Sequence, residues 1–312
     1  MVTAIIFPGQ GCQMVGMAQE FYDNFSTARE VFDEVDDITA KKLTKLIFEG
    51  PLEELTQTSN AQSAIMAASM AILRTIESES GEKMESLCSF SAGHSLGEYT
   101  ALCASRSLTL ADTTKLLKIR GETFAEVGER NHGSMAVLGA SLGLVEKIVR
   151  ESVLAGEILE ITNDNTDDQV VLSGNRDSID KALEQAKVRG ISKIKKLSVS
   201  GAFHSKLMEP AVEIMRSALE NVKIAEPVVG IMANYRAELE NSSEIRDNLL
   251  SQITNRVRWR ETMLNLSKLG VDSFLEVGPG RVLTNMVRKT CPEAKATTIG
   301  SIEQLKKFLK TN

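Results

Sequence analysis

The hydrophobic residues of the chain form short continuous runs that alternate with longer stretches of helical spacing. Thr3–Phe7 is a short apolar run, which predicts a buried strand. From Met14–Ile76 the apolar residues recur at helical spacing. The last part, Ala61–Ile76, has little polar face, so we expect it to be buried against a sheet. Leu87–Phe90 is again short and β-leaning, and small residues continue as a helical pattern over Glu98–Ala104.

The pattern changes between about residues 133 and 200, where short strands and two helices are expected. The strands are Met135–Leu138, Ile158–Asn163, Gln169–Ser173 and Lys193–Val199, and the helices are Leu142–Leu154 and Asp177–Arg189. A polar turn, Asp164–Asp168, joins the middle strands. The order β-α-β-β-α-β is that of a ferredoxin-like domain. Its clean start and finish predict an insertion, residues 131–200, into a larger domain made of residues 1–130 and 201–312.

Strands and helices alternate again after the insertion. A strand is expected at Val228–Met232 and a last core strand at Val271–Glu276, each followed by helical patterns. Alternation of this kind predicts a mostly parallel sheet covered on both faces. The predicted fold class is therefore α/β, with an α/β-hydrolase-like core and an inserted ferredoxin-like subdomain.

Composition and charge narrow the class of protein. Of the 312 residues, 42% are hydrophobic and 25% charged, as in globular proteins. The net charge of −6 gives no overall field for nucleic acid or an anionic membrane. The chain starts with a strand pattern instead of a signal peptide, and its longest apolar run, Ala64–Leu73, is too short to span a bilayer. We therefore expect a cytoplasmic protein.

The cysteine pattern agrees with a reducing compartment. The cysteines show no CxxC pair and no regular spacing, and most lie in or beside apolar or small-residue runs; they are Cys12, Cys88, Cys103 and Cys291. This pattern predicts buried free thiols.

The sequence GHSLG, Gly93–Gly97, is a G-x-S-x-G motif between a predicted strand and a predicted helix. A sharp turn there needs small residues at both glycines and leaves Ser95 exposed at a helix N-terminus. The free N–H groups and the helix dipole at that position can stabilise an oxyanion. A glycine-rich turn in an ordinary α/β domain would look similar, but the flanking pattern favours a nucleophile.

A serine nucleophile needs a base, and the chain has three histidines. His94 is adjacent to Ser95, where neighbouring side chains diverge, and His132 lies in a polar stretch at the start of the insertion. His204 is therefore the candidate base by elimination, at the point where the chain returns to the large domain. No acidic residue is placed to complete a triad, so we expect a Ser–His dyad whose imidazole is oriented by another group, such as a backbone carbonyl.

Five motifs together resemble the malonyl-CoA:acyl-carrier-protein transacylases and the acyltransferase domains of polyketide and fatty-acid synthases. The resemblance covers essentially the whole chain. The motifs are Phe7–Gly11 (FPGQG), Gly93–Tyr99 (GHSLGEY), Lys118–Gly121 (KIRG), Phe203–Ser205 (FHS) and Glu276–Gly280 (EVGPG), the last followed by Val282 and Leu283. Taken alone, the Gly-Gln-Gly segment is typical of a surface turn, and Arg120 of a solvated helix charge paired with Glu122.

The resemblance implies a ping-pong acyl transfer. Ser95 would attack the thioester of malonyl-CoA with His204 as general base, and the thiol of holo-acyl carrier protein would then take the malonyl group. Backbone N–H groups of Gln10 and Leu96 would form the oxyanion hole. The fork of Arg120 would hold the malonyl carboxylate.

The resemblance also implies that the main-chain carbonyl of Gln252 orients the base. No metal or redox cofactor is implied, since coenzyme A enters as a thioester substrate. Some positions depart from the family pattern: Cys12 stands where a serine is common, and Arg256 where a proline is usual. Phe203 before the histidine resembles the malonyl-selective members.

Two basic stretches are candidates for partner binding, although most such runs are solvated faces. They are Lys187, Arg189, Lys193, Lys195 and Lys196 on the insertion, and Arg256, Arg258 and Arg260 after Gln252. We expect one or both to attract the acidic carrier protein and the phosphates of coenzyme A.

The expected activity is an S-malonyltransferase for fatty-acid synthesis, acting as a monomer. A serine thioesterase or lipase-like hydrolase would use the same turn, but it has no need for a carboxylate clamp. A carrier-binding module with a dead site is disfavoured by the intact serine, histidine and arginine. A trans-acting acyltransferase of a polyketide pathway would have much the same sequence.

Overall fold

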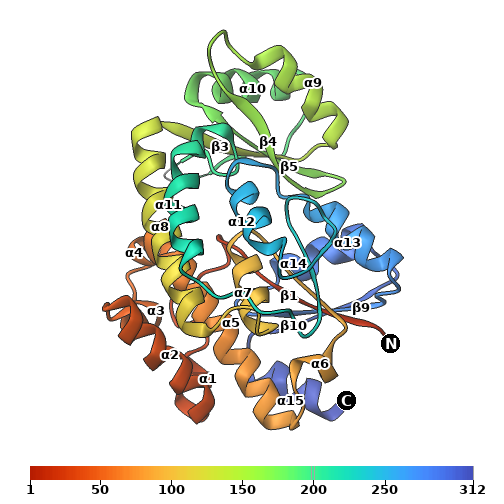
Figure 1. The fold of residues 1–312 in the computed structure, drawn as a ribbon. Helices are drawn as coiled ribbons and strands as arrows, with labels where there is room; N and C mark the ends of the chain where they lie inside the picture. Colours follow the sequence, from red (N-terminus) through yellow and green to blue (C-terminus); the bar gives the residue numbers. More distant parts are fainter. Residues whose placement is uncertain (198, 200, 312) are drawn as a thin grey trace.

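A six-stranded, mostly parallel sheet forms the centre of the larger part of the molecule (Figure 1). The structure is a computed structural model that describes residues 1–197, 199 and 201–311. The strand order is β10-β9-β1-β2-β7-β8, and only β8 runs antiparallel to its neighbour. The strands are β1 (Thr3–Phe7), β2 (Phe90–Gly93), β7 (Gly230–Met232), β8 (Leu239–Glu240), β9 (Ser273–Val277) and β10 (Lys295–Ile299).

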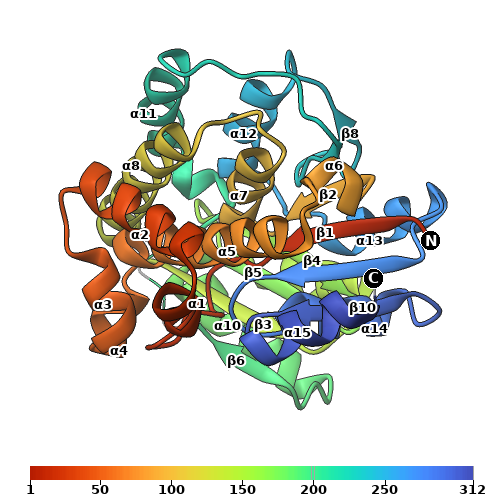
Figure 2. The same cartoon turned by 90° about the horizontal axis from the view of Figure 1, so that it is seen from below.

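Helices cover both faces of this sheet (Figure 2). Those before the insertion are α1 (Gln19–Asn24), α2 (Ser26–Thr39), α3 (Leu43–Glu49), α4 (Leu52–Thr56), α5 (Thr58–Ser80), α6 (Met84–Leu87), α7 (Leu96–Ala104) and α8 (Leu110–Asn131). Those after it are a 3₁₀ turn at Lys206–Met208, α11 (Glu209–Glu220), α12 (Ile245–Thr254), α13 (Trp259–Lys268), α14 (Val282–Thr290) and α15 (Ile302–Thr311). Among the described residues, none of the helices combines the length and the apolar character that crossing a membrane requires.

The central strand β1 contributes to two cores because successive side chains of a strand point to opposite faces. Ile5 and Phe7 lie in the core formed with α5 and α7, whereas Ala4 and Ile6 pack with α13 and α14. Burial on both faces explains why this strand is a continuous apolar run in the sequence.

A second sheet of four antiparallel strands lies beside the first, at the top of Figure 1. Its order is β4-β5-β3-β6, from β3 (Gly133–Leu138), β4 (Leu159–Thr166), β5 (Gln169–Asn175) and β6 (Ile194–Lys196). Helices α9 (Leu142–Ser152) and α10 (Arg176–Val188) share a separate apolar core with it. The predicted fold class, with its β-α-β-β-α-β insertion, is confirmed. The boundaries at residues 130 and 201 stay a prediction.

Three predicted elements differ from the structure. The strand expected at Leu87–Phe90 is β2, Phe90–Gly93, because Leu87 is the last residue of α6. The polar turn expected at Asp164–Asp168 is shorter, since β4 continues to Thr166 and β5 begins at Gln169. The strand expected at Lys193–Val199 is β6, Ile194–Lys196; Ser198 lies outside the described residues.

The last core strand expected at Val271–Glu276 is β9, Ser273–Val277, but one edge strand was not predicted. Beyond Val271–Glu276 the structure adds β10, Lys295–Ile299, parallel to β9. Three of its five residues, KATTI, are polar, because the strand lies at the edge of the sheet and most of its side chains are only half-buried. An edge strand of this kind lacks the apolar run that indicates a buried strand.

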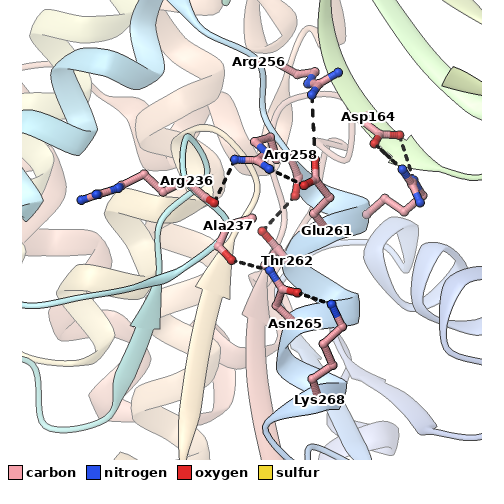
Figure 3. A network of polar contacts seen from close by, with 10 residues as sticks. Asp164, Arg236, Ala237, Arg256, Arg258, Glu261, Thr262, Asn265 and Lys268 are labelled. Atoms are coloured by element: carbon pink, nitrogen blue, oxygen red, sulfur yellow. Dashed lines mark hydrogen bonds and ion pairs between the residues drawn. The ribbon is translucent and has the colours of Figure 1, made fainter. Parts of the chain in front are cut away.

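Ion pairs join the inserted part to the large domain where β4 meets α13 (Figure 3). The buried carboxylate of Asp164 on β4 accepts hydrogen bonds from Arg260 Nε at 3.2 Å and Nη2 at 3.0 Å. The backbone continues the contact: Val257 N–H donates to the carbonyl of Thr162, and the N–H of Asp164 donates to the carbonyl of Val257. Asp164 can therefore belong to a strand although it is polar and buried, because its partners come from the large domain.

Candidate active site

Ser95 occupies a sharp turn between β2 and α7, with backbone angles φ 56° and ψ −110°. The turn is closed so tightly that a Cβ atom on Gly93 would lie 1.8 Å from the carbonyl oxygen of Gly97. A Cβ on Gly97 would lie 2.4 Å from the carbonyl oxygen of Phe7, in β1. Both glycines of the motif are therefore required by packing, and the strained serine is typical of a functional site.

His204 lies within hydrogen-bond distance of the serine. Its Nε2 is 2.8 Å from Ser95 Oγ, and its Nδ1 is 2.7 Å from the backbone carbonyl oxygen of Gln252. Because a carbonyl oxygen only accepts, Nδ1 carries the proton and Nε2 is left to accept the serine hydroxyl. The serine and the histidine thus form a dyad oriented by a backbone carbonyl, as the sequence predicts. His204 also has a positive φ of 59°.

The environment keeps the imidazole of His204 neutral. Its side chain is buried, and desolvation together with the positive charge of Arg120 lowers the pKa of His204 to about 3. A neutral imidazole is the form that can accept a proton from the serine.

Arg120, on α8, is buried next to the nucleophile. Its Nη1 donates to Gln62 Oε1 at 2.6 Å, and its Nη2 to Gln252 Oε1 at 2.8 Å and to Ser95 Oγ at 3.2 Å. The side chain is 1% exposed. Glu122, the partner that a solvated arginine would have used, instead pairs with Lys41 at 3.3 Å. Every hydrogen-bond partner of this guanidinium among the described residues is neutral.

Gln10 and Leu96 are the candidate donors of an oxyanion hole. Leu96 is the first residue of α7, and both residues line the same cavity as Ser95. Within the described part of the chain, neither backbone N–H donates a hydrogen bond. Such donors at a helix N-terminus are suited to a developing negative charge.

A cavity of about 400 Å³ opens in front of Ser95, between the two parts of the molecule. One wall carries the residues described above, and the other comes from β3 to β6, including Met135, Asn165 and Lys195. Phe203 and Phe124 add apolar surface. A search of the described residues finds no cluster of three His, Cys, Asp or Glu side chains suited to a metal ion.

Neither of the other two histidines forms a hydrogen bond with Ser95 Oγ among the described residues, although His94 lines the same cavity. His94 Nε2 is 3.0 Å from Asn165 Oδ1, and its ring packs edge-on against Trp259. His132 is the C-cap of α8, at the start of the inserted part. The four cysteines are all buried and free, as expected.

The sequence did not point to three polar residues that surround the dyad. Gln62 is a polar residue within the largely apolar α5, and this interruption could have indicated it. Asn234 follows β7, at the sheet edge where parallel strands commonly present site residues, beside β2. Glu98 lies within the GHSLGEY motif, but only the structure shows that its side chain is buried toward the site.

The basic residues proposed for partner binding differ in their surroundings. Arg258 Nε lies 2.9 Å from Glu261 Oε1, and Arg260 binds Asp164 (Figure 3). Lys196 pairs with Asp180 at 2.6 Å. Lys193 and Lys195 are exposed and form no ion pair with a described acidic residue. Most of the arginine stretch therefore has partners within the chain.

Comparisons with known proteins identify the family of this chain. The family model for the acyl transferase domain matches residues 4–311. The malonyl CoA-acyl carrier protein transacylase of Bacillus subtilis is 36% identical over 310 residues, covering 99% of this chain and 96% of the relative. The same-named protein of Staphylococcus aureus strain MRSA252 is 33% identical, covering 97% of each chain.

Solved structures give the same result. The acyl-carrier-protein-S-malonyltransferase of Bartonella henselae superposes with a TM-score of 0.95 at 42% identity, covering 100% of this chain and 99% of the other. A malonyl-transacylase in complex with a type II polyketide acyl-carrier protein gives a TM-score of 0.95 at 32% identity over 100% of both chains. The chain therefore belongs to the acyl transferase family, among the malonyl CoA-acyl carrier protein transacylases.

Proposed function

We propose that this protein transfers the malonyl group of malonyl-CoA to the phosphopantetheine thiol of an acyl carrier protein, through an ester at Ser95. The observation that carries the proposal is the buried Arg120, whose Nη2 lies 3.2 Å from Ser95 Oγ. In a malonyl thioester the carboxylate is separated from the reacting carbonyl by a single carbon. A cation that binds this carboxylate must therefore stand beside the nucleophile, and a guanidinium can bind it through two hydrogen bonds.

The first half-reaction forms the ester. His204 Nε2 accepts the hydroxyl proton of Ser95 while Oγ bonds to the thioester carbon. The oxyanion that develops is bound by the N–H groups of Gln10 and Leu96. When this intermediate collapses, the carbon–sulfur bond breaks and the sulfur of coenzyme A leaves with the proton from His204.

The second half-reaction reverses these steps. The thiol of the carrier protein gives its proton to His204, and its sulfur bonds to the ester carbon. The bond to Ser95 Oγ then breaks, and the serine regains its proton from the imidazole. Because the same site serves both thiols, the donor must leave before the acceptor binds.

Lys193 and Lys195 are our candidates for guiding the carrier protein and the phosphates of coenzyme A. Both are exposed on the inserted part, and Lys195 lines the cavity. Arg258 and Arg260 are less suited, because their charges are largely satisfied by Glu261 and Asp164. We propose further that the protein is a cytoplasmic monomer, which is consistent with its free cysteines.

Intact-protein mass spectrometry after brief exposure to malonyl-CoA tests the reaction, with Ser95→Ala as the control. We expect a malonyl adduct on the wild-type protein alone, which holo-carrier protein discharges and water does not. Rapid release of free malonate without an adduct would indicate a hydrolase, and no reaction at all would indicate a carrier-binding module.

The same assay addresses the pathway. We propose that the carrier protein is that of fatty-acid synthesis, whereas one structural relative was solved with a carrier of type II polyketide synthesis. Offering both kinds of holo-carrier to the loaded protein compares their rates directly. Faster discharge by the polyketide carrier would overturn this assignment while leaving the transfer itself intact.

A further inference from the structure

The strained backbone of Ser95 is held by two amide side chains. Its N–H donates to Asn234 Oδ1 at 2.7 Å, and its carbonyl accepts from Gln252 Nε2 at 3.0 Å. Asn234 Nδ2 also donates to the carbonyl of Gly93 at 2.7 Å, so this side chain links the end of β2 to the backbone of Ser95. Residues distant in sequence therefore fix both polar backbone groups of the nucleophile.

One buried carboxyl oxygen binds both of these amide residues. Glu98 Oε2 accepts a hydrogen bond from Gln252 Nε2 at 2.6 Å and from the backbone N–H of Asn234 at 3.3 Å. Glu98 is on the first turn of α7 and is fully buried. Its second oxygen, Oε1, has no hydrogen-bond partner among the described residues.

The contact with Glu98 determines how the amide of Gln252 is oriented. Its NH₂ group faces two acceptors, Glu98 Oε2 and the Ser95 carbonyl, so its Oε1 must face the other way, toward Arg120. A flipped amide would place NH₂ against the guanidinium. The backbone carbonyl of the same residue binds His204.

We propose that Glu98 is a positioning residue for the acyl transfer. Through its contacts with Gln252 and Asn234 it fixes the relative positions of Ser95, Arg120 and His204. This role rests on the function proposed above. Glu98 touches neither substrate nor the reacting atoms, and it contributes an acceptor oxygen at a fixed place. Burial, with the nearby charge of Glu240, also raises the pKa of Glu98, and the carbonyl oxygen of a protonated carboxyl would accept the same two hydrogen bonds.

Glu240 provides a matched control. It is also a buried carboxyl bound by an amide of α12, with Oε2 2.7 Å from Asn248 Nδ2, one helical turn before Gln252. Its Oε1 likewise lacks a partner among the described residues, and none of its hydrogen bonds reaches the dyad or Arg120.

The experiment compares Glu98→Asp, Glu98→Gln and Glu240→Asp in two assays. The first follows malonyl loading of Ser95 by rapid-quench mass spectrometry. The second follows labelling of Ser95 by a fluorophosphonate, which reports the reactivity of the serine without any acyl substrate. If the wild-type protein is labelled but not malonylated, the proposed function fails while the positioning role can still be tested.

Glu98→Asp withdraws the carboxyl by one methylene, and we expect both rates to fall by at least tenfold, because displacements near 1 Å can cost about a hundredfold. Glu98→Gln keeps an oxygen at the Oε2 position and should stay within about threefold of wild type, as should Glu240→Asp. Wild-type rates in Glu98→Asp, or an equal loss in Glu240→Asp, would overturn the proposal. If Glu98→Asp does not fold, a tenfold loss in folded Glu98→Gln would overturn it.

Discussion

A buried guanidinium whose hydrogen-bond partners are all neutral is unusual, because a charge removed from water normally has a bonded partner of opposite sign. Arg120 is such a residue: its hydrogen-bond partners are two glutamine side chains and the hydroxyl of Ser95. Desolvation lowers the pKa of this guanidinium, but an arginine stays protonated in proteins. A substrate carboxylate would supply a hydrogen-bond partner of negative charge. Its charge would also offset part of the effect by which Arg120 lowers the pKa of His204.

Arg120→Ala should therefore change which acyl group is accepted. We expect malonyl transfer to fall by about tenfold to a hundredfold in kcat/KM, since hydrogen bonds to charged groups contribute about 1.5–3 kcal/mol. Acetyl transfer should stay the same or rise. Arg120→Lys keeps the charge without the fork and should lie between the two. Equal losses of malonyl and acetyl transfer in Arg120→Ala would contradict the clamp.

The titration of His204 gives a second prediction at this scale. Its pKa is lowered to about 3, and a lowered pKa means that the neutral base persists as the pH falls below the ordinary value near 6.5. NMR of the imidazole signals, of which the chain has three, should show His204 unprotonated at pH 5. Arg120→Ala removes a positive charge and should move this pKa upward. A wild-type pKa near 6.5 would contradict the burial argument.

At the scale of elements, strands with a strong local pattern were predicted closely, and those that depend on tertiary partners were not. Thr3–Phe7 was predicted with its correct bounds because both faces of β1 are buried. The end of β4 was taken for a turn because Asp164 and Asn165 are polar, whereas Arg260 and His94 satisfy them from the large domain. The sequence around β4 does not show that residues so distant in the chain will bind these polar side chains.

In the candidate site, too, residues with a local sequence signal were predicted and residues that depend on tertiary contacts were not. Ser95, His204 and Arg120 were found from a motif, from elimination and from a resemblance, and the structure brings all three together. Glu98 and Asn234 were missed because their importance lies in contacts between α7, α12 and the segment after β7. Those contacts exist only once the sheet has formed.

At the scale of the whole molecule, the acidic net charge of −6 and the exposed lysines of β6 act in opposite directions on an acidic partner. Under the proposed function, a local basic surface would offset this general repulsion. Lys195 lines the cavity, and Lys193, two residues before it in the sequence, is also exposed, so both are our candidates for acting on a carrier whose prosthetic arm enters the cavity.

Charge reversal of these two lysines tests this surface. Lys193→Glu with Lys195→Glu should raise the KM for carrier protein by roughly threefold to tenfold, since an exposed ion pair contributes about 0.2–1 kcal/mol. The effect should shrink at high salt, and kcat should change little. Lys306→Glu with Lys310→Glu, on α15, makes the same change in net charge elsewhere. An equal rise in KM for both pairs would exclude a local docking surface.

The strand order β10-β9-β1-β2 affects how the chain can fold while the ribosome is still synthesising it. β1 is the first strand to be made, yet one of its two hydrogen-bonding edges waits for β9, Ser273–Val277. At bacterial or eukaryotic rates of synthesis that delay is on the order of 15–50 seconds. During this time a highly apolar strand has an unpaired edge, which is a template for aggregation. The nascent chain should therefore be a client for chaperones until almost its entire length has emerged.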